Sequence, residues 1–244
     1  MKENKYDDAR FFDQYSRFPR SVQGLSAAGE WHELQRMLPA FEGKRVLDLG
    51  CGFGWHCIYA AQQGAASVVG VDLSEKMLAE AKRKTQHPNV TYIRQSIEDF
   101  VYPKEAFDVV ISSLAFHYVA SFDAVCERVG QSLAPGGDFV FSVEHPAFTA
   151  QGKQDWAYSS AGDILHWPVD GYFLEGERNA VFLGENITKY HRTLTSYFQG
   201  LLKHGFRVTE LCEPTPSGDM LKSVPGMQDE LRRPMMLIIA AKKV

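Results

Sequence analysis

Residues 46–56 read Val-Leu-Asp-Leu-Gly-Cys-Gly-Phe-Gly-Trp-His, an apolar run that reaches an acid and then passes three glycines at alternate positions. This pattern predicts a buried parallel strand that turns sharply into a helix. Gly50, Gly52 and Gly54 can adopt positive φ angles and carry no side chain, so a ligand can lie directly against their backbone N–H groups. The stretch therefore predicts a cofactor-binding loop.

Strands and helices are expected to alternate around this loop, which is typical of a parallel sheet with helices on both faces. The last expected strand is apolar throughout, which predicts an interior position. Ala-Pro-Gly-Gly at 134–137 predicts the end of a helix. The fold class is therefore α/β, doubly wound and mostly parallel. The expected strands cover 45–49, 67–72, 90–95, 107–112, 138–144, 206–212 and 235–241, and the expected helices cover 54–63, 75–84, 121–134 and 193–205.

Composition narrows the class of partner. The 244 residues include 26 Lys and Arg against 30 Asp and Glu, a formal net charge of -4, which argues against binding nucleic acid or an anionic membrane. We find no signal-peptide pattern, in which a charged stretch precedes an apolar one, and no run of 18 apolar residues. A cytoplasmic location is therefore expected. The four cysteines lack CxxC spacing, so neither zinc nor a disulfide is expected. The predicted partner is a small molecule.

Two segments stand outside the alternation in what we expect to be a single domain, 1–244. Residues 1–40 have apolar and aromatic side chains at helical spacing and are predicted to form an N-terminal helical lid. Residues 146–192 are rich in Trp, Tyr and Phe, which predicts a folded insertion after the fifth strand because so many aromatic side chains require burial. Both segments are predicted to cover the substrate.

A dinucleotide is one candidate for the ligand of the glycine loop. Dinucleotide-binding folds use G-x-G-x-x-G, in which the third glycine packs the helix against the strand. Here the third glycine, Gly54, comes one residue early and is followed by the bulky Trp55. The chain also has no Tyr-x-x-x-Lys pair, so the usual acid of short-chain reductases is missing. An NAD-dependent oxidoreductase is therefore the weaker interpretation, and Asp48 could instead hold an ammonium group of the ligand.

Four motifs in order carry a resemblance to a known family. Asp-Leu-Gly-Cys-Gly-Phe-Gly at 48–54 is followed by Asp72 at the end of the second strand, Phe-Asp-Val-Val at 107–110 and Leu-Ala-Pro-Gly-Gly at 133–137. Together they resemble the class I S-adenosylmethionine-dependent methyltransferases, especially the small-molecule branch that includes the ubiquinone/menaquinone methyltransferase-like proteins. The resemblance implies a seven-stranded sheet of order 3-2-1-4-5-7-6 with the last strand antiparallel. It also implies methyl transfer from S-adenosylmethionine to an O, N or C nucleophile, leaving S-adenosylhomocysteine.

The resemblance assigns cofactor contacts to the loop and to the second strand. Gly50, Cys51 and Gly52 would pass under the methionine part of the cofactor. Asp48 would support its amino group, and Asp72 would accept hydrogen bonds from both ribose hydroxyls. Each acid also has a structural interpretation, because Asp48 could satisfy N–H groups of the turn and Asp72 could cap the next helix.

Further cofactor contacts are implied beyond the second, third and fourth strands. Leu73 and Met77 would flank the adenine or the ribose, or would simply pack their helix. Ser96 stands where the family commonly has an aspartate, so Glu98 or Asp99 could supply the acceptor for the adenine amine. The implied contact residues are Leu73, Met77, Ile97, Glu98, Ser113 and Leu114.

Three candidates for catalysis follow the fourth and fifth strands, where this architecture exposes side chains to the ligand. His117 lies a few residues after the fourth strand, and Glu144 and His145 end the fifth. Each could accept a proton or contact the acceptor. Alternatively, His117 could open the next helix and Glu144 could bind backbone of the insertion. No spacing of metal ligands supports a metal site.

Substrate contacts are predicted from both added segments, by Tyr15 and Arg20 near the N-terminus and by Tyr190 and Arg192 where the insertion ends. If residues 189–192 form a strand, Tyr190 and Arg192 share one face, and Arg192 could pair with a carboxylate of the substrate. A cofactor-binding regulatory protein without catalysis remains the alternative, since it would keep the glycine loop and Asp72 but would need no acceptor site.

Overall fold

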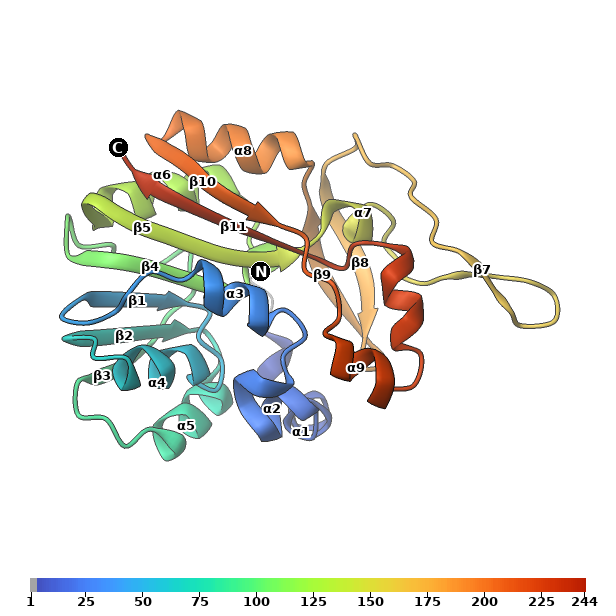
Figure 1. Ribbon diagram of the computed structural model, residues 1–244, viewed down its shortest axis with the longest axis horizontal. Helices are drawn as coiled ribbons and strands as arrows, with labels where there is room; N and C mark the ends of the chain where they lie inside the picture. Colours follow the sequence, from blue (N-terminus) through green and yellow to red (C-terminus); the bar gives the residue numbers. More distant parts are fainter. Residues whose placement is uncertain (1–3) are drawn as a thin grey trace.

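Seven strands form one mostly parallel sheet in the computed structural model, which describes residues 4–244 (Figure 1). The sheet order is β3-β2-β1-β4-β5-β11-β10, with β11 antiparallel to both of its neighbours, so the predicted order and fold class are confirmed. The strands are β1 (Arg45–Leu49), β2 (Ser67–Asp72), β3 (Val90–Arg94), β4 (Phe107–Ser113), β5 (Leu133–Glu144), β10 (Phe206–Cys212) and β11 (Met236–Lys243).

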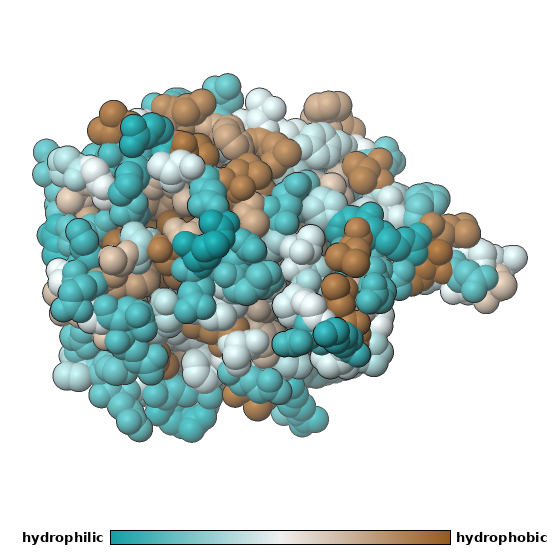
Figure 2. Space-filling view, in the orientation of Figure 1, coloured by the Kyte–Doolittle hydropathy of each residue, from teal (hydrophilic) through white to brown (hydrophobic). Residues whose placement is uncertain are grey.

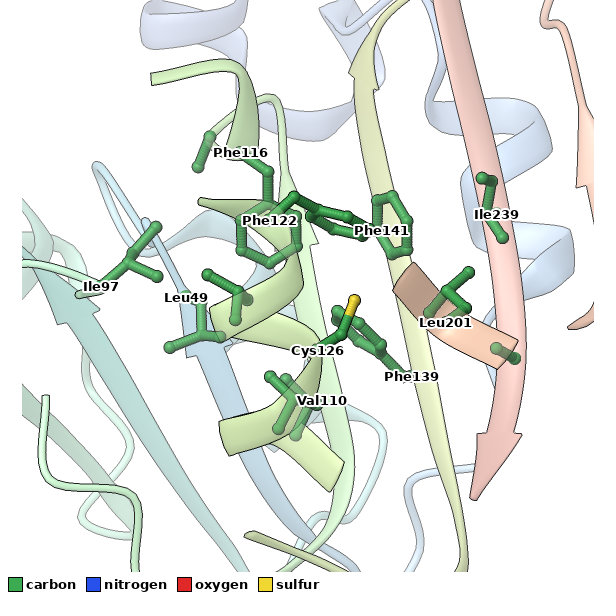
Figure 3. Close-up of a cluster of buried hydrophobic side chains, with 14 of the residues drawn as sticks. Leu49, Ile97, Val110, Phe116, Phe122, Cys126, Phe139, Phe141, Leu201 and Ile239 are labelled. Atoms are coloured by element: carbon green, nitrogen blue, oxygen red, sulfur yellow. The ribbon is translucent and has the colours of Figure 1, made fainter. Parts of the chain in front are cut away.

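Helices cover both faces of the sheet. One face carries α3 (Trp31–Met37), α4 (Trp55–Gln62) and α5 (Glu75–Lys84), whose apolar side chains pack on residues such as Val46 and Val140. The other face carries α6 (Phe122–Ser132) and α8 (Leu194–Lys203). Figure 3 shows Phe122 and Leu201 of these two helices beside Phe141 of β5. The predicted doubly wound arrangement follows from burial of the strands on both sides.

The boundary between α6 and β5 differs from the predicted one. The helix ends at Ser132 and the strand begins at Leu133, whereas we expected a helix to 134 and a strand from 138. Leu133 is buried and pairs with Phe107, and the register shifts between Phe107 and Val109. The Pro-Gly-Gly sequence therefore lies within an irregular start of β5, because the sheet pairing of Leu133 overrides the local signal for a turn.

The glycine loop has the predicted shape. Gly50, Gly52 and Gly54 have φ angles of 76°, 52° and 74°, which favour glycine. The N–H groups of Gly50 and Cys51 both donate to the carbonyl of Val71, at 2.8 and 3.0 Å. The loop is therefore fastened to the end of β2 before α4 begins.

The N-terminal segment is helical from residue 5 onward, and residues 1–3 of the predicted lid lie outside the described residues. It contacts α5 through Asp7, whose carboxylate accepts from Ser74 Oγ at 2.6 Å and from the N–H of Lys76 at 3.1 Å. Its elements are η1 (Lys5–Asp7), α1 (Ala9–Ser16), α2 (Pro19–Gln23) and η2 (Gly24–Ala27), followed by α3.

The insertion forms two hairpins after a short helix, α7 (Pro146–Thr149). The hairpin of β8 (Gly176–Phe182) and β9 (Glu185–His191) lies beyond the end of the sheet, and the ring of Phe182 stacks on Phe18 of the N-terminal segment at 6.0 Å (Figure 1). The hairpin of β6 (Ala157–Tyr158) and β7 (Ile164–His166) projects from the molecule. In Figure 2 some hydrophobic side chains gather on this projection and over α9 (Gly218–Ser223), which precedes η4 (Met227–Arg232).

Nothing between residues 4 and 244 has the helical length and apolar character that crossing a membrane requires. Within the same range, no group of three His, Cys, Asp or Glu side chains is arranged to hold a metal ion.

We expect Gly54→Ala to destabilise the fold more than the control Gly43→Ala. Both glycines have positive φ angles, 74° and 68°, so each alanine pays a similar conformational cost of about 1 kcal/mol. A Cβ at position 54 would also lie 2.2 Å from Tyr92 Oη, which is held by Thr85 at 2.7 Å, whereas a Cβ at position 43 meets nothing within 4 Å. Urea denaturation should show an additional loss of about 1 kcal/mol or more. Equal losses would contradict the close contact of this turn with β3.

Candidate active site

A cavity of about 330 Å³ lies at the C-terminal ends of the parallel strands. Its wall combines the glycine loop, the ends of β2, β4 and β5, the N-terminal segment and the β8–β9 hairpin. This is the edge toward which the parallel strands point in Figure 1. The volume is within the range of small-ligand sites, and the place is the switch point of the sheet, where such folds bind ligands.

Asp72 lies in the cavity wall directly beside the glycine loop. Its Oδ2 accepts from the N–H of Gly52 at 2.8 Å and its Oδ1 from the N–H of Ser74 at 2.9 Å. Ser74 itself caps α5, because its Oγ accepts from the N–H of Met77 at 3.1 Å. Burial raises the pKa of Asp72 above its ordinary value. Each carboxylate oxygen keeps further acceptor capacity, which suits a diol.

The glycine loop forms the adjoining part of the wall, with Gly50, Cys51 and Gly52 all lining the cavity. A Cβ on Gly52 would meet nothing within 4 Å, so this backbone is open to a ligand. A Cβ on Gly50 would lie 2.4 Å from the Cβ of Ala115, so the loop also needs glycine to approach the segment after β4. The backbone of the loop is therefore accessible on one side and tightly packed on the other.

Asp48 lies behind the loop and does not line the cavity. Its side chain is 1% exposed, and its Oδ2 accepts from Cys57 Sγ of α4 at 3.3 Å. Burial raises the pKa of this carboxyl to about 7. The predicted direct contact of Asp48 with an amino group of the ligand thus has no support from its position, and its partner is the Cys57 thiol rather than the N–H groups of the turn that the structural interpretation named.

The next part of the wall is apolar with one acid. Leu73, Met77, Ile97 and Glu98 line the cavity, and Asp99 does not. The side chain of Asp99 instead accepts from Ser96 Oγ at 2.9 Å, while the N–H of Asp99 donates to that hydroxyl at 3.0 Å. Of the two acids left open by the sequence, Glu98 is the one placed to meet a ligand.

A buried polar cluster closes the cavity beneath the N-terminal helices. Arg20 donates to Glu30 Oε1 at 3.0 Å and to Ser113 Oγ at 3.1 Å, and Ser113 Oγ lies 3.2 Å from the same Glu30 oxygen. Burial raises the pKa of Glu30, but Arg20 together with hydrogen bonds from the backbone and from Ser113 holds the pKa below its ordinary value. Leu114, which also lines the cavity, has a φ angle of 52°. Arg20 and Ser113 were predicted from the sequence as site residues. Glu30 was not, because an acid at the start of a helix, here α3, is common and gives no signal of a site.

Two of the three catalytic candidates are brought together. His117 and Glu144 line the cavity, and the N–H of Glu144 donates to His117 Nδ1 at 3.4 Å. Burial lowers the pKa of His117 to about 4, so the ring is neutral near pH 7. His145 lies outside the wall, because its Nδ1 accepts from the N–H of Ala147 and its Nε2 lies 2.7 Å from a Glu213 oxygen.

The four predicted substrate residues divide in the same way. Tyr15 and Arg20 line the cavity, whereas Tyr190 and Arg192 do not. Arg192 donates to the carbonyls of Phe116 and Val119 and so supports the segment that carries His117. The strand considered at 189–192 exists as the end of β9, which ends at His191. The face of β9 that is buried toward Glu144 is the face that carries Lys189.

Most of the aromatic wall was not assigned from the sequence. The only signal was the density of aromatic residues in both added segments, and it could not pair residues so distant along the chain. The missed aromatic residues of the wall are Tyr6, Phe18, Phe53, Trp55, Tyr118 and Phe182.

Comparison with known proteins gives the family. The family model described as a methyltransferase domain matches residues 46–137. The crystal structure of a proposed S-adenosylmethionine-dependent methyltransferase from Listeria monocytogenes has a TM-score of 0.86 at 59% identity, covering 91% of this chain and 99% of that one. The crystal structure of an S-adenosylmethionine-dependent methyltransferase from Mesorhizobium loti has a TM-score of 0.84 at 40% identity, covering 90% of this chain and 100% of that one. The chain belongs to the class I S-adenosylmethionine-dependent methyltransferases.

This methyltransferase is also similar to a protein of the ubiquinone branch. A ubiquinone biosynthesis O-methyltransferase from Mesorhizobium japonicum is 35% identical to it over 64% of this chain and 65% of that protein.

The wall of the methyltransferase fits its cofactor, S-adenosylmethionine. Asp72 offers carboxylate oxygens for a diol, Gly52 offers open backbone, and the apolar segment beside Glu98 offers a surface for a flat ring. Near the loop, Ser21 Oγ, Trp55 Nε1 and His56 Nε2 are buried polar atoms without a hydrogen-bond partner among residues 4–244. Such orphaned groups are rare in native proteins and are frequent where a ligand belongs.

We expect Asp72→Asn to weaken binding of S-adenosylhomocysteine at least about tenfold, because one charged acceptor for the ribose is lost. Isothermal titration calorimetry measures this change directly. Asp138→Asn is the matched control, since its carboxylate pairs with Lys242 at 2.7 Å and lies outside the cavity wall. Unchanged affinity in the Asp72 variant would contradict the assignment of this acid.

We expect Asp48→Asn to gain stability relative to the native protein as the pH rises. The folded pKa of about 7 lies above the ordinary value of 3.8, so ionisation of Asp48 weakens the fold progressively over that interval. The amide removes this effect, and one pKa unit corresponds to about 1.4 kcal/mol. Urea denaturation should show that the unfolding free energy of the variant, relative to that of the native protein, is higher at about pH 8 than at about pH 5 by about 1 kcal/mol or more. A constant difference would contradict a protonated Asp48.

Proposed function

We propose that this methyltransferase transfers the methyl group of S-adenosylmethionine to a small-molecule acceptor by in-line displacement. One observation carries the proposal. The cavity that holds Asp72 and the glycine loop continues between aromatic and ionisable groups of the N-terminal segment, the end of β5 and the insertion. A protein that only binds the cofactor would need no such continuation beside the reacting carbon.

The cofactor supplies an electrophilic methyl group on a sulfonium, so the protein mainly has to align the acceptor and exclude water. We assign Asp72 to the ribose, the backbone of Gly50 and Gly52 to the methionine part, and Glu98 to the adenine amine. We assign the remaining N–H groups of Arg20 to the carboxylate of the methionine part, and the contact of Arg20 with Ser113 at the end of β4 supports this assignment. His117 and Glu144 remain for the acceptor.

The two added segments are the proposed cover of the site. Tyr6, Tyr15 and Phe18 come from the N-terminal segment and Phe182 from the insertion, and all four line the cavity. A wall closed by these rings leaves room for a small acceptor rather than for a folded macromolecule. The net charge of -4 also disfavours a nucleic-acid acceptor.

Turnover with a mixture of small metabolites tests the function. Purified protein and S-adenosylmethionine carrying a labelled methyl group should give S-adenosylhomocysteine and one labelled small product, both seen by mass spectrometry. Asp72→Asn should lower the rate at limiting cofactor by about tenfold, in line with its weaker binding. Tight binding of S-adenosylhomocysteine without labelled product from any metabolite fraction would favour the regulatory alternative. Absence of binding would remove both.

A further inference from the structure

The carboxylate of Glu144 is held at the cavity by two side chains of the insertion. Lys189 Nζ lies 2.6 Å from Oε1, and Gln154 Nε2 donates to Oε2 at 2.7 Å. Lys189 also donates to Gln154 Oε1 at 2.8 Å, which closes the cluster. A carboxylate has about four acceptor positions, so each oxygen keeps capacity for a ligand. Glu144 is therefore a fixed acceptor of hydrogen bonds in the cavity wall.

The backbone of Gln154 gives an independent sign that this cluster serves a ligand. Its φ angle is 50°, a left-handed conformation that costs about 1 kcal/mol or more for a residue other than glycine. Lys189 is only 3% exposed, and a buried ion pair adds little to stability compared with an apolar pair. Strain and buried charge together are characteristic of residues that are positioned for binding.

Aromatic rings share the cavity wall with this carboxylate. Lys189 Nζ lies 5.6 Å from the centre of the Phe182 ring. His117, whose Nδ1 accepts from the backbone N–H of Glu144, packs on Tyr118 at 4.4 Å between ring centres. Tyr118 Oη in turn lies 3.2 Å from Tyr6 Oη. The faces of aromatic rings attract cations, and a ring-lined site with an acid is suited to an ammonium group.

The other ionisable groups in the wall disfavour an acidic acceptor. Arg20 is the one Lys or Arg among the described residues that line the cavity; it is paired with Glu30, and the function proposed above assigns its remaining N–H groups to the carboxylate of the cofactor. Lys189 lies behind Glu144 and is paired with it. An anionic oxygen would thus meet the Glu144 carboxylate with no free cation to offset the repulsion.

His117 is poorly arranged to activate a hydroxyl group. Its Nδ1 accepts the N–H of Glu144, so the proton of the neutral ring is on Nε2. A ring in this tautomer presents a donor at Nε2 and cannot take a proton there. His117 is therefore not the base for an alcohol or phenol, and the Glu144 carboxylate beside it is the group in this part of the wall that can take a proton.

On the basis of the function proposed above, we propose that the acceptor is a small amine. Its nitrogen is held by Glu144, in the part of the cavity that the aromatic side chains of Tyr6, Tyr118 and Phe182 line. The amine binds as its ammonium form, which donates hydrogen bonds to Glu144. One proton passes to the Glu144 carboxylate, and the lone pair that this frees attacks the methyl carbon. The nitrogen–carbon bond forms as the carbon–sulfur bond breaks, and that bond's electron pair stays on sulfur. Glu144 then releases its proton to water as the methylated ammonium product leaves.

Binding of matched ligands tests the inference on the intact protein saturated with S-adenosylhomocysteine. The probes are benzylamine, benzyl alcohol and benzoate, and in a second series butylamine, butanol and butyrate, each titrated by calorimetry near pH 7.5. We expect the amine to bind at least about tenfold more tightly than the alcohol in at least one series, and the carboxylate to bind weakest. An equal or reversed order in both series, or an amine that shows no binding, overturns the inference.

Variants connect the preference to Glu144. Glu144→Gln should reduce the preference for amine over alcohol about tenfold while binding of S-adenosylhomocysteine stays within twofold. Because this change leaves Lys189 unpaired, the double variant Glu144→Gln with Lys189→Met provides the same test without a buried lone charge. Glu213→Gln, outside the cavity, is the control and should keep the preference. An undiminished preference in folded Glu144 variants overturns the role of Glu144.

The two proposals fail in different ways. If the native protein does not bind S-adenosylhomocysteine, the proposed function itself is wrong. If it binds S-adenosylhomocysteine but the labelled methyl group is found on the oxygen of a carboxylic acid or an alcohol, methyl transfer stands. The assignment of an amine as the acceptor is then overturned.

Discussion

The attachment of the glycine loop to the end of β2 is the constraint on which the site depends. Gly50 and Cys51 donate to the carbonyl of Val71, and Gly52 donates to the carboxylate of Asp72. These bonds require the loop to turn back on itself with positive φ angles, which explains three glycines at alternate positions. They also fix the distance between the open backbone of the loop and the carboxylate of Asp72, the acid that we propose for the ribose. The bonds that form the turn therefore also set the relative positions of the two groups proposed for the cofactor.

This local construction is why the cofactor half of the molecule could be predicted from the sequence. The loop and Asp72 are each encoded within a few consecutive residues that follow a parallel strand, whereas the strand order and the contact segment at Ile97 and Glu98 are implied by the family resemblance. Asp48 illustrates the limit of the same reasoning. A motif shows that an acid precedes the first glycine, but only the packing of α4 decides that its carboxylate faces Cys57 rather than the cavity.

The acceptor half could not be predicted to the same degree, because its residues meet only through the tertiary fold. Glu144 ends a strand, as expected, but its partners Gln154 and Lys189 are supplied by a loop and a hairpin of the insertion. Residues 189–191 alternate between buried and less buried side chains at the end of β9, but Arg192 lies beyond the strand and is buried as well. Which of the two faces would be buried depends on how the hairpin docks against the end of β5, and this docking has no local signal. Arg192 consequently supports the segment of His117 from outside the wall.

The N-terminal segment connects the two halves. Asp7 accepts from Ser74 and from the backbone of α5, directly after the strand end that carries Asp72. The preceding residue, Tyr6, contacts Tyr118 in the aromatic wall of the acceptor. Because both contacts belong to one short helical turn, displacing this turn would open the ribose side and the acceptor side together. The position of this one turn therefore affects both the wall beside Asp72 and the wall beside Tyr118.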